Sequence, residues 1–127
     1  MTTAARDILA VDDSALIRHV VNVGLPAPAW HVISAESGEE ALVLAAEAHF
    51  DAVLLDVVMP GLDGPATFAR LRATPLTREI PVVFLTGSIE EPDRDRLRTL
   101  GAAGVIANPF DPASQAEQLA AAVGWRS

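Results

Sequence analysis

The sequence predicts an α/β fold in which a doubly wound, five-stranded parallel sheet carries helices on both faces. Two observations support this prediction. Five short apolar runs alternate with five segments of helical character along the 127 residues. The runs are apolar throughout, which is typical of parallel strands that are buried on both faces. Because crossovers between parallel strands are right-handed, few topologies remain, and we expect the strand order 2-1-3-4-5.

The predicted strands are short apolar runs that end at polar or turn-forming residues. They span residues 8–11, 31–34, 52–56, 81–85 and 105–107. The central run follows Asp51, ends at Asp56 and continues into a turn that contains Pro60, Gly61 and Gly64. Proline fixes one backbone dihedral and the two glycines permit positive φ, so we expect the chain to leave this strand as a shaped loop.

The predicted helices follow the strands. They span residues 14–24, 37–48, 65–72, 91–100 and 112–123. Ser37 and Glu40 have the spacing of a capping box, in which two side chains satisfy backbone N–H groups at the start of a helix. In the most charged helix we expect Leu97 and Leu100 to face the core. Because strands and helices alternate along the chain, we expect the flavodoxin-like strand order 2-1-3-4-5.

The composition limits the classes of protein to which the chain can belong. Its 127 residues, 50% of them hydrophobic, suffice for one domain, which we expect to span residues 1–127 with no output domain. The absence of cysteine excludes disulfides, thiolate metal sites and thiol nucleophiles. The formal net charge of −8 disfavours direct binding to nucleic acid or to an anionic membrane. No run is long enough to span a membrane and no signal segment begins the chain, so we expect a cytoplasmic protein.

Polar residues follow three of the predicted strands at the same edge of the sheet. Asp12 and Asp13 follow the first strand, and Asp56 ends the neighbouring third strand, so their side chains should share one crevice. Carboxylates that share a pocket repel one another, which is relieved by raised pKa values or by a divalent cation. Mg²⁺ suits such oxygen ligands, and the backbone carbonyl of Val58 would complete the set. With the hydroxyl of Thr86 at the end of strand four, the residues supply a nucleophile, a metal and a hydrogen-bond donor, as phosphoryl transfer requires.

Four short motifs carry a family resemblance. They lie at residues 11–14, 55–64, 85–87 and 108–110. In this combination the sequence resembles the receiver domain of the response regulators of two-component signalling, and the resemblance covers essentially the whole chain. It implies that Asp56 accepts a phosphoryl group from a histidine kinase or a phosphotransfer protein. It also implies that Asp12 and Asp13 hold Mg²⁺ and that Thr86 binds a phosphoryl oxygen.

Two positions depart from the family pattern. Asn108 stands where the family has a lysine, and Val105 stands where the family has an aromatic switch residue. Asparagine cannot neutralise a phosphoryl charge, so we expect a more electronegative pocket that depends more on Mg²⁺. Valine cannot exchange between exposed and buried rotamers beside Thr86, and we therefore favour a rewired switch over neutral drift. The resemblance also implies a cis peptide bond between Asn108 and Pro109.

The resemblance leads to a prediction of function. We expect a stand-alone receiver that is not an enzyme beyond its own phosphorylation and dephosphorylation, and that signals through a downstream protein partner. The kinase or phosphotransfer protein should contact the start of the first helix, at Ser14, Ala15 and Leu16. The sequence leaves open which kinase this is and whether the chain forms a homodimer.

Three alternatives compete with this prediction. The first is a pseudo-receiver, a protein-binding module that works without phosphorylation, and Asn108 favours it. The second is a Mg²⁺-dependent phosphatase with an aspartyl nucleophile, but such enzymes carry Asp-x-Asp at the strand end, and Val58 occupies the place of the second aspartate. The third is a flavin carrier, in which Asp12 and Asp13 would repel the phosphate of the cofactor.

Overall fold

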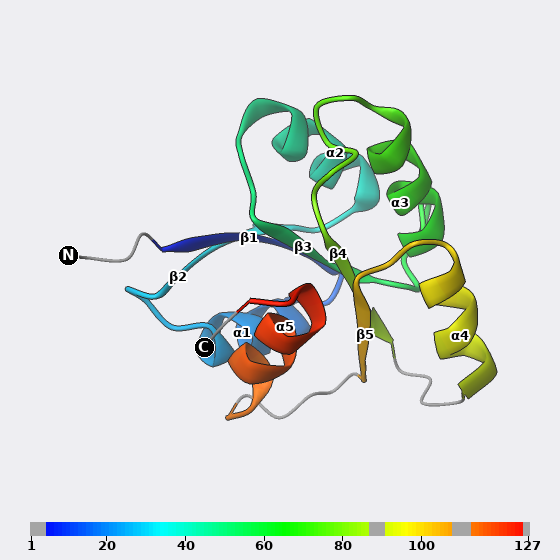
Figure 1. Cartoon of the computed structure of the whole chain (residues 1–127). Helices are drawn as coiled ribbons and strands as arrows, with labels where there is room; N and C mark the ends of the chain where they lie inside the picture. Colours follow the sequence, from blue (N-terminus) through cyan, green and yellow to red (C-terminus); the bar gives the residue numbers. More distant parts are fainter. Residues whose placement is uncertain (1–4, 87–90, 108–112, 126–127) are drawn as a thin grey trace.

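A computed structural model describes residues 5–86, 91–107 and 113–125, and side chains throughout these ranges except at 91–94. Its sheet has five parallel strands in the order β2-β1-β3-β4-β5, which confirms the predicted fold class and strand order (Figure 1). In chain order the elements are β1 (Arg6–Val11), α1 (Ala15–Gly24), β2 (Trp30–Ala35), α2 (Gly38–Glu47), β3 (Ala52–Asp56), α3 (Gly64–Ala73), β4 (Val82–Thr86), α4 (Glu91–Thr99), β5 (Gly104–Ala107) and α5 (Gln115–Val123).

The sheet divides the hydrophobic core into two layers, one on each face. Because successive side chains of a strand point to opposite faces, Ile8 and Ala10 of β1 enter one layer, and Leu9 and Val11 enter the other. The first layer is closed by α1 and α5, and the second by α2, α3 and α4 (Figure 1). All four of these β1 residues are buried. This explains why the strands are apolar throughout rather than alternating with polar residues.

Side-chain caps fix where the helices next to the site begin. The Oγ atom of Ser14 accepts a hydrogen bond from the N–H of Ile17 at 3.3 Å, at the start of α1. The Oγ atom of Ser37 accepts one from the N–H of Glu40 at 3.1 Å, as the capping-box spacing predicts. The carboxylate of Glu40 returns the contact one residue earlier than expected, at the N–H of Glu36 (2.9 Å).

One core prediction on α4 is wrong. Leu97 is buried, as expected, but the side chain of Leu100 is 48% exposed. The helix ends at Thr99 and the chain turns at Gly101, which has a φ of +109°. Leu100 therefore lies past the last helical residue, where the three-residue spacing of a helix face no longer decides which way a side chain points.

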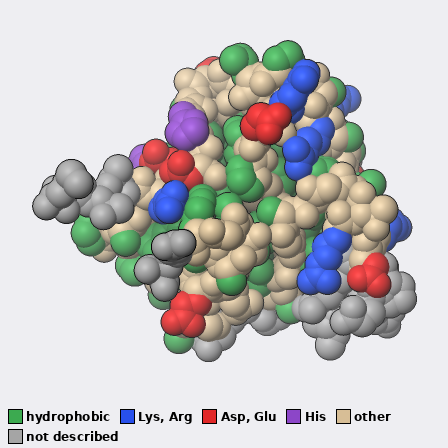
Figure 2. All heavy atoms as spheres, viewed as in Figure 1, with side chains coloured by type: hydrophobic (Ala, Val, Ile, Leu, Met, Phe, Trp, Pro, Cys, Tyr) green, Lys and Arg blue, Asp and Glu red, His purple; other side chains and the backbone are tan. Residues whose placement is uncertain are grey.

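The surface of the described part of the chain mixes several kinds of side chain. Figure 2 shows basic side chains over the side of the molecule that carries α3 and α4, and acidic and histidine side chains near the start of β1. Two histidines pair with aspartates: His31 lies 2.9 Å from Asp7, and His49 lies 3.3 Å from Asp51. Within the described ranges, no helix has both the length and the apolar character needed to cross a membrane.

Candidate functional site

The pairing of β1 with β3 brings the three predicted carboxylates together. Val11 is paired with Leu55, so the residues that follow them, Asp12 and Asp56, end neighbouring strands at the same edge of the sheet. One carboxylate oxygen from each of Asp12, Asp13 and Asp56 lies within 4.8 Å of the others. We call these three residues the acidic cluster. Its geometry agrees with what the sequence predicts.

Within the acidic cluster, Asp12 has one oxygen engaged and one free. Its side chain is buried, and its Oδ1 atom accepts a hydrogen bond from the N–H of Ser14 at 2.9 Å. Its Oδ2 atom is also buried and has no hydrogen-bond partner among the described residues. An unpaired buried carboxylate oxygen costs free energy unless a ligand satisfies it. This oxygen therefore fits a bound cation.

Two carboxyl groups of the cluster, those of the buried Asp12 and the half-buried Asp56, resist ionisation. Burial, and secondly the charge of Asp12, raise the pKa of Asp56 to about 6, although the N–H of Val58 favours the ionised form. Burial also raises the pKa of Asp12, while the N–H of Ser14 and the charge of Arg18 oppose this shift. A divalent cation among the three carboxylates would relieve both the burial cost and the mutual repulsion. Carboxylate oxygens are the ligands that Mg²⁺ prefers in proteins, so the donor set fits this ion.

The loop between β3 and α3 holds Asp56 through backbone contacts. Gly61 has a φ of +73°, a conformation that glycine permits, and the N–H of Leu62 donates to Oε1 of Glu39 at 3.3 Å. Gly64, the second glycine of the loop, does not have positive φ. Gly64 is needed for a different reason, because a Cβ atom there would collide with the carbonyl oxygen of Asp56.

Val58 was predicted to bind the metal through its backbone carbonyl, and the structure describes its N–H contact and its side chain. The N–H of Val58 lies 3.4 Å from Oδ1 of Asp56, a long hydrogen bond, and the Val58 side chain is 78% exposed. The part that its carbonyl plays as a metal ligand stays a prediction.

Two of the remaining site residues of the prediction, Thr86 and Val105, lie on β4 and β5. Thr86 is buried at the end of β4, directly after Leu85, which is paired with Asp56. Val105 is partly buried on β5, where it packs against the core layer that α2, α3 and α4 close. Asn108 and its bond to Pro109 lie outside the described residues, so both predictions there stay predictions.

The predicted partner surface is exposed where the prediction needs it. Ser14 is half-buried because it caps α1, whereas Ala15 and Leu16 point outward from the first turn. The side chain of Leu16 is 69% exposed. The contact of this turn with a partner stays a prediction.

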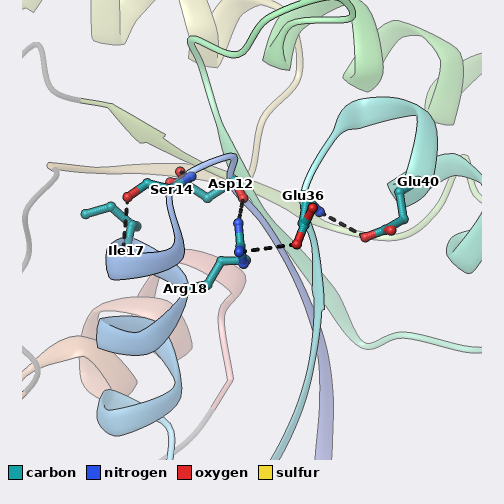
Figure 3. A network of polar contacts seen from close by, with 6 residues as sticks. All are labelled: Asp12, Ser14, Ile17, Arg18, Glu36 and Glu40. Carbon is teal, nitrogen blue, oxygen red and sulfur yellow. Dashed lines mark hydrogen bonds and ion pairs between the residues drawn. The ribbon is translucent and has the colours of Figure 1, made fainter.

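One residue that contacts the acidic cluster from α1, Arg18, was not predicted from the sequence. The guanidinium group of Arg18 donates through Nη1 to the backbone carbonyl of Asp12 at 2.7 Å, and its Nη2 atom lies 3.5 Å from Oε1 of Glu36 (Figure 3). The sequence feature that could have indicated Arg18 is its spacing. Arg18 lies four residues after Ser14, the residue that caps α1, and so about one helical turn from the end of β1. The direction of its long side chain, however, depends on tertiary structure.

Comparison with known proteins identifies the same family that the four sequence motifs resemble. The family model described as "Response regulator receiver domain" matches residues 8–120. The chain is 36% identical over 105 residues to the transcriptional regulatory protein ResD of Bacillus subtilis, covering 83% of this chain and 42% of that protein. It is 39% identical over 108 residues to the phosphate regulon transcriptional regulatory protein PhoB of Escherichia coli, covering 85% of this chain and 47% of that protein. The chain thus spans about half the length of the curated relatives that it matches.

Solved structures resemble this one over nearly their full length. The chemotaxis response regulator CheY4 of Vibrio cholerae superposes with a TM-score of 0.87 at 30% identity, covering 94% of this chain and 99% of that one. A putative response regulator from Chloroflexus aurantiacus superposes with a TM-score of 0.86 at 29% identity. With a matching family model, matching relatives and the same fold, the chain belongs to the response regulator receiver domain family.

Proposed function

We propose that this chain is a receiver that accepts a phosphoryl group on Asp56, in the presence of Mg²⁺, from a histidine kinase or a phosphotransfer protein. The observation that carries the proposal is the acidic cluster at the carboxyl edge of the sheet, with the Oδ2 atom of Asp12 buried and unpaired. Membership of the family supports it, because receiver domains bind Mg²⁺ at an acidic pocket of this kind.

The proposed reaction is a direct displacement at phosphorus. A carboxylate oxygen of Asp56 attacks, a new O–P bond forms, and the P–N bond of the donor phosphohistidine breaks with its electron pair going to the imidazole. With a pKa of about 6, the carboxyl group of Asp56 is mostly ionised at neutral pH and can act as the nucleophile. Asp12 and Asp13, with the Val58 carbonyl, would hold Mg²⁺, which supplies positive charge for the phosphoryl oxygens when it is bound.

Residues on β4 and β5 would respond to the phosphoryl group. Thr86 is our candidate for a hydrogen bond to a phosphoryl oxygen, because its buried hydroxyl ends the strand next to Asp56. Asn108 would donate in place of the lysine of the family, without its charge. Val105 is already packed against the core, so we expect the signal to pass by movement of β5 and its neighbours rather than by exchange of an aromatic rotamer.

The surface that meets the phosphodonor would surround the mouth of the acidic cluster. Leu16 on the first turn of α1 and Val58 in the loop after β3 are both large, hydrophobic and mostly exposed. Isolated exposed hydrophobic residues are common, but these two follow the acidic residues at the ends of neighbouring strands. A donor that brings its phosphohistidine to Asp56 would cover both. Output would follow through a further protein that distinguishes the two states.

The proposal is tested by intact-mass spectrometry after incubation with Mg²⁺ and acetyl phosphate. We expect the wild-type protein to gain one phosphoryl group, and no gain for Asp56→Asn or without Mg²⁺. Asp95→Asn is the matched control, since it makes the same change on exposed α4, and it should be phosphorylated like the wild type. No gain in the wild type would contradict the proposal and favour a binding module that works without phosphorylation. A gain that persists in Asp56→Asn would mean that another residue is the acceptor.

A further inference from the structure

Arg18 connects α1 to the strand end that carries Asp12. Its side chain is 17% exposed and points back from the first turns of α1 (Figure 3). The Nη1 atom donates to the backbone carbonyl of Asp12 at 2.7 Å, which is short for such a bond. Hydrogen bonds with a charged donor are both shorter and stronger than those between neutral groups. The main chain of Asp12 is therefore held from one side by a strong contact.

Asp12 is held at a second point, so that its orientation is defined. The N–H of Ser14 donates to its Oδ1 atom at 2.9 Å, which fixes the carboxylate relative to the following turn. With the carbonyl bound to Arg18 and Oδ1 bound to Ser14, only the buried Oδ2 atom of Asp12 lacks a partner among the described residues. These two contacts determine where that oxygen lies relative to Asp13 and Asp56.

The other end of the guanidinium group reaches the start of α2. Its Nη2 atom lies 3.5 Å from Oε1 of Glu36, whose own N–H donates to Glu40 at 2.9 Å (Figure 3). The Glu36 side chain is 73% exposed, so water screens this ion pair and it adds little. The contact that matters for the site is the one with Asp12.

We propose that Arg18 is a positioning residue for the cation site, because its hydrogen bond to the Asp12 carbonyl holds the Asp12 carboxylate in the geometry that binds Mg²⁺. This inference rests on the proposed function of the acidic cluster. Groups that orient metal ligands from outside the coordination shell typically change metal affinity by about 10- to 100-fold when they are removed.

The charge of Arg18 makes the direction of the effect informative. If Arg18 acted only through its charge, its removal would leave the acidic cluster more negative, and a divalent cation would bind more tightly. If Arg18 positions Asp12, its removal lets the strand end move, and the cation binds more weakly. The two roles therefore predict opposite changes in the dissociation constant.

The test measures binding of Mn²⁺ to the full chain from the electron paramagnetic resonance signal of the free ion, with Mg²⁺ as competitor. Arg18→Met keeps the length and packing of the side-chain stem but removes the donors and the charge. We expect it to bind Mn²⁺ about tenfold more weakly than the wild type. Arg18→Lys keeps one donor and should recover most of the affinity. Arg70→Met makes the same change on the exposed last turn of α3 and should bind like the wild type.

Each outcome decides the question. Unchanged or tighter binding by Arg18→Met overturns the inference, and so does Arg18→Lys binding as weakly as Arg18→Met. Melting curves recorded without metal establish that each variant is folded, and the amide resonance of Ser14 reports whether its bond to Asp12 has changed. If the wild-type protein itself bound no Mn²⁺, the cation site of the proposed function would fail first, and this inference with it.

Discussion

Asp56 is a carboxyl group whose surroundings favour its protonated form. Burial and the charge of Asp12 raise its pKa from 3.8 to about 6. Because the folded protein then holds a proton that the unfolded chain has released, the free energy of unfolding of the metal-free protein falls as pH rises from about 4 to 6. Above about pH 6, this loss in the free energy of unfolding is complete. At 1.36 kcal/mol per pKa unit it is at most about 3 kcal/mol, and solvent screening lowers it to about 1–2 kcal/mol.

This shift leads to a prediction for Asp56→Asn. In the absence of metal at pH 7.5, the variant should be more stable than the wild type by about 1–2 kcal/mol, because it removes the repelled charge. At pH 4.5 the difference should shrink, since the folded wild type is then protonated. Urea denaturation in EDTA at the two pH values measures both quantities.

The same measurement has an internal control and a clear contrary result. Asp95→Asn, on exposed α4, should match the wild type at both pH values. With saturating Mg²⁺ the order of Asp56→Asn and wild type should reverse, because a ligand that binds only the folded state stabilises it. An Asp56→Asn variant that is no more stable than the wild type in EDTA at pH 7.5 would show that repulsion in the cluster is weak.

Residue by residue, the sequence predicted the acidic cluster but not the group that holds it. Asp12, Asp13 and Asp56 could be predicted because parallel strands bring their carboxyl ends to one edge of the sheet. Their position follows from topology alone. Arg18 could not be predicted, because its contact with the Asp12 carbonyl depends on how α1 packs and on the rotamer of a long side chain.

At the scale of elements, the β3–α3 loop depends on two glycines for different reasons. Gly61 adopts a φ of +73°, whereas Gly64 lies at the start of α3, where its N–H donates to the carbonyl of Val57 at 3.0 Å. The backbone of Gly64 lies so close to Asp56 that a Cβ atom would collide with its carbonyl oxygen. The packing of α3 therefore helps to set the position of the proposed phosphoacceptor.

We predict that Gly64→Ala impairs phosphorylation more than its cost in stability explains. Overpacking of this kind costs about 1–3 kcal/mol, and the strain falls on the backbone of Asp56. The rate of phosphorylation by acetyl phosphate should therefore drop by tenfold or more in protein that is still folded, since small displacements at a reacting group can cost about 100-fold. Intact-mass time courses and urea denaturation measure the two effects.

Gly61→Ala is the matched control for this prediction. It strains the same loop through a positive φ and should cost about 1–2 kcal/mol, but its Cβ atom would approach Glu39 rather than Asp56. We expect a smaller loss of phosphorylation rate than in Gly64→Ala. Equal rates in the two variants would mean that loop strain in general, and not contact with Asp56, controls the reaction.

The elements themselves could largely be predicted, because the central strands β1, β3 and β4 consist mainly of apolar residues that are buried on both faces of the sheet. Where the prediction failed or was incomplete, a helix end or a tertiary contact decided the structure. Leu100 has the helical spacing from Leu97, but it lies past the end of α4 and is exposed. Gly64 is a typical turn residue, but in the fold it is needed because its backbone lies close to the carbonyl oxygen of Asp56. Neither outcome is contained in the local sequence pattern.

Considered as a whole, the molecule has its acidic cluster at the carboxyl ends of the strands and the end of α5 near the amino ends of β1 and β2. At the start of β1 and β2, the rings of Trp30 and Trp125 lie 6.1 Å apart, and the guanidinium of Arg6 lies 4.2 Å above the ring of Trp125. Gly124, with a φ of +85°, ends α5 and turns the chain so that Trp125 reaches this position. The end of α5 therefore packs at the amino ends of β1 and β2, whereas Asp56 lies at the carboxyl end of β3.

Because the two regions lie at opposite ends of the strands, we predict that a substitution at Trp125 lowers the stability of the fold without weakening the binding of Mn²⁺ to the acidic cluster. Trp125→Ala should lower the free energy of unfolding by about 2–3 kcal/mol, the combined loss of ring packing, buried area and the cation–π contact with Arg6. Trp125→Phe keeps a ring and should lose about half as much. Both variants should bind Mn²⁺ with wild-type affinity at temperatures where they are folded, because the rigid strands between the edges do not change. A shift of more than threefold in that affinity would show instead that α5 and the acidic cluster are coupled through the sheet, so that anchoring the end of α5 is part of the switch.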